Sequence, residues 1–177
     1  MKKVLGSILF IIYVTMVIIV TILLLSYNDY MCSEIAGYTF YIVKDDSLEP
    51  DYLKGDLLII NQSSDRNINI GDKLYFYQNL ANNEYYVKYG ELTDKYTQGI
   101  RTVYILDGEY QYDASYLIGK EKGSYAFHNI GTILGILESR WGYLFFVVII
   151  TLLLFLEELY ELYMEIKYGN EITVKEG

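Results

Sequence analysis

The chain has 177 residues, of which 53% are apolar, and a formal net charge of −9. The negative charge argues against a basic surface, so no nucleic-acid partner is predicted. The single cysteine, Cys32, can form neither an intramolecular disulfide nor a cysteine-rich zinc site. The composition therefore favours one modest domain with apolar anchoring segments, without a cofactor or a metal.

An apolar run near the N-terminus predicts a membrane anchor. Residues 4–25 carry no charged side chain, and as a helix they are long enough to cross a bilayer core of about 30 Å. The run is longer than the apolar core of a cleaved signal peptide, and no A-x-A cleavage pattern follows it. We therefore expect residues 1–25 to remain as a transmembrane anchor. A targeting segment that is removed is the alternative.

A second apolar run, residues 141–156, predicts a C-terminal transmembrane helix over residues 141–160. Its length is marginal, so an interfacial or buried helix is the alternative. Trp141 and Tyr143 suit the level of the lipid headgroups. Residues 161–177 are then expected to form an acidic tail.

The charges at the N-terminus predict the orientation in the membrane. Lys2 and Lys3 precede the first apolar run, which places the N-terminus in the cytoplasm. Residues 26–140 then lie on the extracytoplasmic side of the plasma membrane, and the acidic tail returns to the cytoplasm. The chain is thus expected to be a multi-pass protein whose surroundings include the lipid bilayer.

The segment between the two runs is expected to be mostly β. Five runs rich in β-branched and aromatic residues predict strands: residues 38–43, 56–60, 73–78, 84–92 and 102–106. Turn signals separate them at Gly55, Gly71 and residues 82–83, and residues 61–70 form a polar connector. These features predict a small antiparallel β-barrel or sandwich flanked by the two transmembrane helices.

One serine and one lysine in this segment can supply hydrolytic chemistry without histidine or metal. Pro50 biases its neighbourhood toward an extended backbone, which can hold Ser47 exposed at the end of a strand. Lys88 stands between Val87 and Tyr89, and an amine among apolar groups loses solvation, which favours its neutral form. A neutral Lys88 could take the proton of Ser47 during attack on a carbonyl.

Two further side chains have catalytic chemistry, each with a plainer interpretation. His128, the only histidine, could act as a base for Ser47, but it lies near the second apolar run and is expected to be an interfacial or packed residue. Cys32 could be a nucleophile, but no histidine lies near it in the sequence, so an inert residue is expected.

Five motifs follow one another in this segment: SLEPDYLKGDLLII (47–60), NIGDKLYFY (69–77), YYVKYGEL (85–92), LDGEYQYDAS (106–115) and YLIGK (116–120). In their order and spacing they resemble signal peptidase I, the membrane-bound serine peptidase that removes signal peptides. Leu48 stands where this family usually has methionine. Lys88 matches the lysine of the bacterial branch, whereas the second apolar run is similar to the endoplasmic-reticulum-like branch.

The resemblance implies a β-rich catalytic domain that cleaves secretory precursors at their signal peptides, after small residues. It implies Ser47 as nucleophile, with its backbone N–H in the oxyanion hole, and Lys88 as general base. Asp113 or Glu109 would occupy the acidic position near the base, and Asp113 is the better placed of the two. The partners would be signal peptides of secretory precursors and the bilayer.

The chain departs from the family directly before the serine, where Asp45 and Asp46 replace Ser-Gly. Asp45 accepts hydrogen bonds where the family residue donates one, and loss of one oxyanion donor costs about 2.7–4 kcal/mol. In the later motif, Glu109 stands where aspartate is usual. The departures leave a catalytically attenuated or inactive protein open, which would serve as a binding or assembly module. A structural membrane protein, in which Ser47 and Lys88 never meet, is the third possibility.

Overall fold

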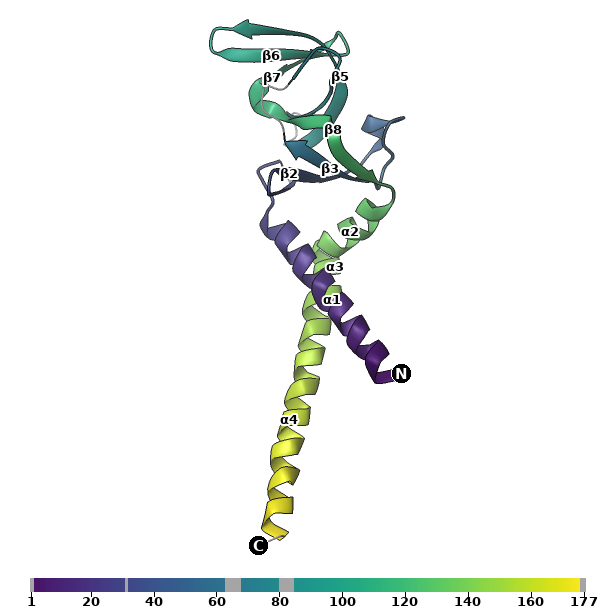
Figure 1. The fold of residues 1–177 in the computed structure, drawn as a ribbon, viewed down its shortest axis with the longest axis vertical. Coiled ribbons are helices and arrows are strands. Elements are labelled where there is room, and N and C mark those ends of the chain that lie inside the picture. Colours follow the sequence, from purple (N-terminus) through teal and green to yellow (C-terminus); the bar gives the residue numbers. More distant parts are fainter. Residues whose placement is uncertain (1, 31, 63–67, 80–84, 176–177) are drawn as a thin grey trace. The chain divides into compact units, whose positions relative to one another are not determined.

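The computed structural model describes residues 2–30, 32–62, 68–79 and 85–175. Two compact units, residues 1–135 and 136–177, make up the chain. The first unit contains an N-terminal helix, an antiparallel sheet and the start of a short helix that follows the sheet (Figure 1). The helical elements are α1 (Lys2–Leu25), α2 (Ile130–Glu138), α3 (Arg140–Gly142), the π-helical segment η4 (Tyr143–Ile149) and α4 (Ile150–Lys175).

Eight strands form one sheet in the order β1-β2-β3-β8-β4-β5-β6-β7, and neighbouring strands are antiparallel. The strands are β1 (Ser33–Ile35), β2 (Tyr38–Ile42), β3 (Leu57–Gln62), β4 (Lys73–Asn79), β5 (Tyr85–Gln98), β6 (Arg101–Leu106), β7 (Tyr110–Asp113) and β8 (Leu117–Phe127). The predicted antiparallel β structure between two long apolar helices is confirmed. The sheet is open, however, so the expected barrel does not close.

The sheet stays open because its two ends are built differently. At one end β1 is only three residues long and follows α1 closely. At the other end the second half of β5 forms a ribbon with β6, and the last six residues of β5 are exposed. Within the described residues β1 pairs with β2 and β7 pairs with β6, and no strand joins β1 to β7, so the two edges of the sheet do not meet.

The five predicted strands correspond to β2, β3, β4, β5 and β6. The sequence did not predict β1 and β7, and β8 extends to Phe127 from the short strand that the family resemblance implied. Most of β8 is exposed and carries charged residues, which hides its strand character. Gly119 lets β8 approach β3 closely, because a Cβ atom there would overlap the Asn61 carbonyl.

The turn predictions are confirmed at two glycines and untested at the third position. Gly55 and Gly71 adopt φ values of 91° and 90°, which side chains with a Cβ atom rarely adopt. The predicted turn at residues 82–83 lies outside the described residues, as does half of the polar connector, residues 63–67.

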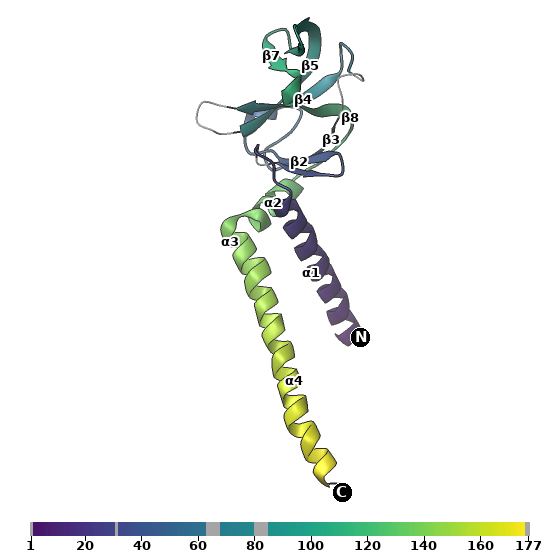
Figure 2. The same cartoon turned by 90° about the vertical axis from the view of Figure 1, so that its left-hand side faces the viewer.

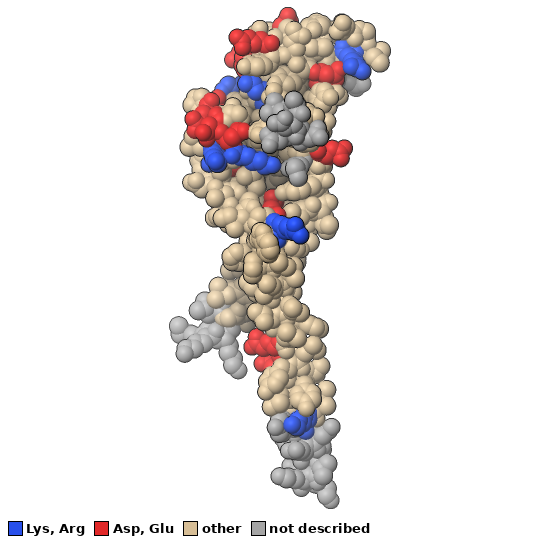
Figure 3. Space-filling view, turned by 180° about the vertical axis from the view of Figure 1, so that it is seen from behind, with Lys and Arg blue, Asp and Glu red and all other residues tan. Residues whose placement is uncertain are grey.

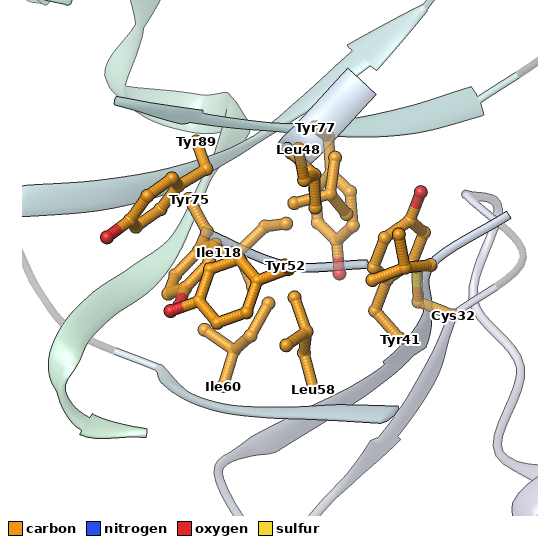
Figure 4. Packing of buried hydrophobic residues seen from close by; sticks show 12 residues of the cluster. Cys32, Tyr41, Leu48, Tyr52, Leu58, Ile60, Tyr75, Tyr77, Tyr89 and Ile118 are labelled. Carbon is orange, nitrogen blue, oxygen red and sulfur yellow. The ribbon is translucent and has the colours of Figure 1, made fainter. Parts of the chain in front are cut away.

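The period-two alternation of the central strands creates two apolar clusters, one on each face of the sheet. On β4, Tyr75 and Tyr77 belong to the first cluster, whereas Leu74 and Phe76 belong to the second. Figure 4 shows the first cluster, in which several tyrosine rings pack against aliphatic side chains such as Ile60. The buried tyrosines of this cluster are Tyr41, Tyr52, Tyr75, Tyr77 and Tyr89.

Asp56 joins the turn before β3 to the start of α2, although its side chain is almost fully buried, with 1% of the residue exposed. Its carboxylate accepts hydrogen bonds from the Leu53 N–H at 3.0 Å and the Asn129 N–H at 3.3 Å, and it contacts His128 Nδ1 at 3.0 Å. Burial would raise the pKa of Asp56, but these three partners together hold it below its usual value.

We expect Asp56→Asn to destabilise the sheet domain by about 1.5–3 kcal/mol at neutral pH, because bonds to a charged acceptor are lost. A lowered pKa in the folded state stabilises the protein above the unfolded-state pKa of about 3.9, and this contribution disappears as the pH falls through the folded-state value. The difference between wild type and variant should therefore shrink below about pH 4. Thermal unfolding in detergent across pH measures it, with the exposed Asp94→Asn as control. A difference that does not vary with pH would contradict this role.

Two helical segments are long and apolar enough to cross a membrane: Gly6–Leu25, with mean hydropathy 3.2, and Arg140–Lys167, with mean hydropathy 2.2. The second is longer than the predicted residues 141–160, because α4 continues into the segment expected to be a tail. On the face that Figure 3 shows, charged side chains gather over the strands, and the helices carry few of them.

Candidate functional site

Ser47 lies in the middle of a short 3-10 turn, η1 (Asp46–Leu48), between β2 and β3. The side chain of Asp45 caps this turn by accepting a hydrogen bond from the Ser47 N–H at 3.0 Å. Leu48 is buried in the first cluster and pins the turn to the sheet, while Ser47 itself remains exposed. The serine is thus held on a fixed turn with its hydroxyl at the surface.

Lys88 lies in the first half of β5, opposite Phe76 of β4. Directly opposed residues of antiparallel strands point to the same face, so Lys88 lies on the face of the second cluster. Its Nζ is 4.2 Å from the centre of the Tyr110 ring. A ring in this position attracts a lysine ammonium group and so favours this placement of the side chain.

The structure places the two reacting residues on neighbouring elements without bringing them into contact. The Cα atoms of η1 approach those of β5 to within 8 Å. Leu48 packs with Val87 and Tyr89 on one face of β5, however, and Lys88 points to the other. Among the interactions of the described residues, no hydrogen bond joins the Ser47 hydroxyl to the Lys88 amine.

The edge of β5 next to η1 is open. β6 pairs with β5 only from Leu92 onward, so residues 85–90 have no partner strand on that side within the described part of the chain. The Glu91 backbone bonds Asp107 on the side away from β4. Because peptide groups of a strand alternate in direction, the N–H and C=O groups of Val87 and Tyr89 also point toward the open edge.

The hydroxyl of Tyr41 on β2 lies beside this edge. It is buried and makes no hydrogen bond of ordinary geometry within the described part of the chain, although it lies close to the Val87 backbone. Burial raises the pKa of Tyr41 well above its usual value, so this hydroxyl stays protonated. The open edge is therefore bordered by β2 and by η1, which follows β2 in the chain.

Neither of the two carboxylates that were expected to support the base, Asp113 and Glu109, pairs with Lys88 among the described residues. Asp113 caps the 3-10 turn η3 (Ala114–Tyr116) by accepting from the Ser115 N–H at 2.9 Å, which lowers its pKa, and it lies 3.9 Å from Arg101 Nε. Glu109 is exposed in the turn between β6 and β7. No ion pair joins either carboxylate to Lys88 among the described residues, so their supporting role stays a prediction.

The plainer interpretations of His128 and Cys32 agree with their surroundings. His128 pairs with Asp56, and its side chain is otherwise mostly exposed. Cys32 is buried, with 2% of the residue exposed, and burial raises the pKa of its thiol to about 12. A thiol in this state is not a nucleophile near neutral pH.

Two contacts at the site were not anticipated. An aspartate before a short helical turn is a common N-cap, so residues 45–47 did carry the signal for the bond to the Ser47 N–H. The Tyr110 ring over Lys88 depends on the long-range pairing of β5, β6 and β7, which no local pattern reveals.

The chain matches no protein-family model, no curated protein and no solved structure in comparisons with each.

We expect Tyr110→Leu to make the Lys88 amine about two- to fivefold more reactive toward acylating reagents, because loss of a partly exposed cation–π contact is worth about 0.5–1 kcal/mol. Mass spectrometry of peptides after brief labelling measures the rate. Tyr96→Leu is a matched control, since Tyr96 and Tyr110 are 41% and 43% exposed. Equal rates in wild type and Tyr110→Leu would show that the ring does not restrain the Lys88 amine.

Proposed function

We propose that this chain is a membrane-anchored serine endopeptidase of the signal peptidase I type, which removes signal peptides from exported proteins. In this proposal α1 and the α3–α4 segment cross the plasma membrane, and the sheet domain lies on the extracytoplasmic side. Ser47 is the nucleophile and Lys88 the general base, with Asp113 or Glu109 as acidic support.

The observation that carries the proposal is an exposed serine on a fixed turn beside an open strand edge. An extended peptide can add to residues 85–90 of β5 as a further strand, held by the outward N–H and C=O groups of Val87 and Tyr89. Such a peptide would lie between β5 and η1, where the Ser47 hydroxyl is exposed. Lys88 belongs to the same stretch of β5 but points to the other face, so catalysis requires its amine to reach the serine around the open edge.

The chemistry follows a serine–lysine mechanism. The Ser47 oxygen attacks the scissile carbonyl carbon while neutral Lys88 accepts the hydroxyl proton. The tetrahedral intermediate collapses to an ester on Ser47, and Lys88 returns the proton to the leaving amine. Water then attacks the ester with Lys88 again as base, which releases the carboxylate product and restores the serine.

A second candidate function is a catalytically attenuated or inactive protein that binds or assembles with exported chains through the same edge. The bond from the Ser47 N–H to Asp45 favours it, because an N–H that is already used cannot stabilise an oxyanion. The same Asp-x-Ser cap recurs at Asp113 and Ser115, so the bond has a purely structural explanation.

We expect replacement of Asp45-Asp46 by Ser-Gly to raise cleavage of a secretory precursor with an A-x-A site by about 10²–10³-fold, because one oxyanion donor is gained. Ser47→Ala and Lys88→Met in either background should abolish cleavage. Gel analysis of precursor and product in proteoliposomes measures the rates.

Ser115→Ala is the matched control for this experiment, since Ser115 occupies the same position in an aspartate-capped 3-10 turn. It should cleave at the wild-type rate. Cleavage that survives Ser47→Ala would refute the peptidase assignment. Absence of cleavage even after the Ser-Gly replacement would leave the binding function.

Binding along the open edge has its own test, which needs no catalysis. We expect a substrate peptide to bind Ser47→Ala protein about two- to tenfold more weakly for each N-methyl group that removes a ladder hydrogen bond. Methyl groups one residue further along should have little effect, because those N–H groups point away from β5. Fluorescence anisotropy in detergent measures the affinities. Equal weakening at both registers would contradict strand addition.

A further inference from the structure

The short helix α2 presents an unbroken apolar face to the outside of the sheet domain. Residues 129–137 contain no charged side chain. Ile130, Ile133 and Ile136 are 46%, 59% and 54% exposed, although each is a large aliphatic residue. Their three-residue spacing places them along one side of the helix.

The opposite side of α2 is fixed against the sheet domain. The Thr132 N–H donates to the Gly55 carbonyl at 3.0 Å. A Cβ atom on Gly131 would lie 2.6 Å from the Asp56 carbonyl oxygen, so only glycine allows this close approach. With this side anchored, the isoleucines cannot rotate inward, and their exposure is built into the fold.

Other large apolar side chains near α2 are exposed as well. Phe127, at the end of β8, is 45% exposed, and Leu53, on the turn that Asp56 ties to the start of α2, is 52% exposed. Figure 2 shows that α2 and the C-terminal end of α1 lie on the same side of the sheet. α2 thus lies on the side of the sheet to which the C-terminal end of α1 is attached.

The chain on both sides of the domain limits how far this surface can lie from a membrane. The end of α1 is bonded to β1, since the Ser33 hydroxyl donates to the Leu23 carbonyl at 2.8 Å and the Glu34 N–H to the Ser26 carbonyl at 2.9 Å. Ile136 is five residues before Trp141, so their Cα atoms are at most roughly 18 Å apart. Tryptophan at the start of an apolar helix favours the headgroup level.

We propose that α2 is an interfacial helix, which lies in the boundary between lipid headgroups and acyl chains with Ile130, Ile133 and Ile136 toward the lipid. The proposal rests on the membrane anchoring in the proposed function. The apolar face of α2 is close in the chain to segments that cross the membrane in this proposal, so lipid is the apolar partner nearest to it. α2 would then hold the sheet domain flat against the bilayer, with the open edge of β5 within reach of a membrane-bound precursor.

The test uses the full-length protein in vesicles of phosphatidylcholine and phosphatidylglycerol. Cys32→Ala protein receives a single new cysteine at Ile133, carrying an environment-sensitive fluorophore. Leu152→Cys in α4 serves as the control for depth in the bilayer, and Gln98→Cys on the exposed β5–β6 ribbon as the control for water. Iodide in the buffer and doxyl groups at graded depths on the lipids act as quenchers.

We expect the Ile133 label to be quenched by shallow doxyl lipids at least about threefold more strongly than the Gln98 label, and to be shielded from iodide. Quenching of the Ile133 label by iodide, with the Leu152 label still in lipid, would overturn the interfacial helix and leave the anchoring intact. If iodide quenched the labels at positions 133 and 152 alike, the membrane anchoring in the proposed function would be refuted as well. Shielding of the Ile133 label from both quenchers would assign the face to a protein partner and would overturn the proposal.

Discussion

The alternation of side chains along β5 is the constraint on which the site depends. A strand sends successive residues to opposite faces, so a strand that places Val87 and Tyr89 in the first cluster must place Lys88 toward the second. Leu48 enters the first cluster and carries Ser47 with it. Contact between the serine and the lysine can therefore occur only around the strand edge, and the open edge at residues 85–90 is what permits it.

Much of the fold could be predicted because its signals are local. The five β-rich runs, the turns at Gly55 and Gly71 and the two long apolar helices follow from residue type and spacing. β8 was underestimated because its residues are largely exposed, even though it is central to the sheet. Closure of the sheet could not be predicted, since it depends on how β1 and β7 are placed by the elements between them.

The residues of the candidate site could be proposed from the sequence, but their geometry could not. The order of the motifs pointed to Ser47 and Lys88, and the sequence already showed the departure at Asp45. The sequence could not show in which direction each side chain points, because the Tyr110 contact and the Asp45 cap depend on strand register and on backbone dihedral angles. Both contacts act against catalysis in this conformation, since one holds the Lys88 amine against the Tyr110 ring and the other occupies the Ser47 N–H.

An open strand edge is unfavourable for a protein, because unpaired backbone groups invite association with other chains. Within the described residues, the stretch of β5 that lies outside the β6 ladder is short. It is bordered by Tyr41 and η1 on one side and by the start of the pairing with β6 on the other. Under the proposed function, such an edge would accept one extended chain in one place. Peptide binding would then be common to the enzyme and to the inactive module, and the bond between Asp45 and the Ser47 N–H would separate the two.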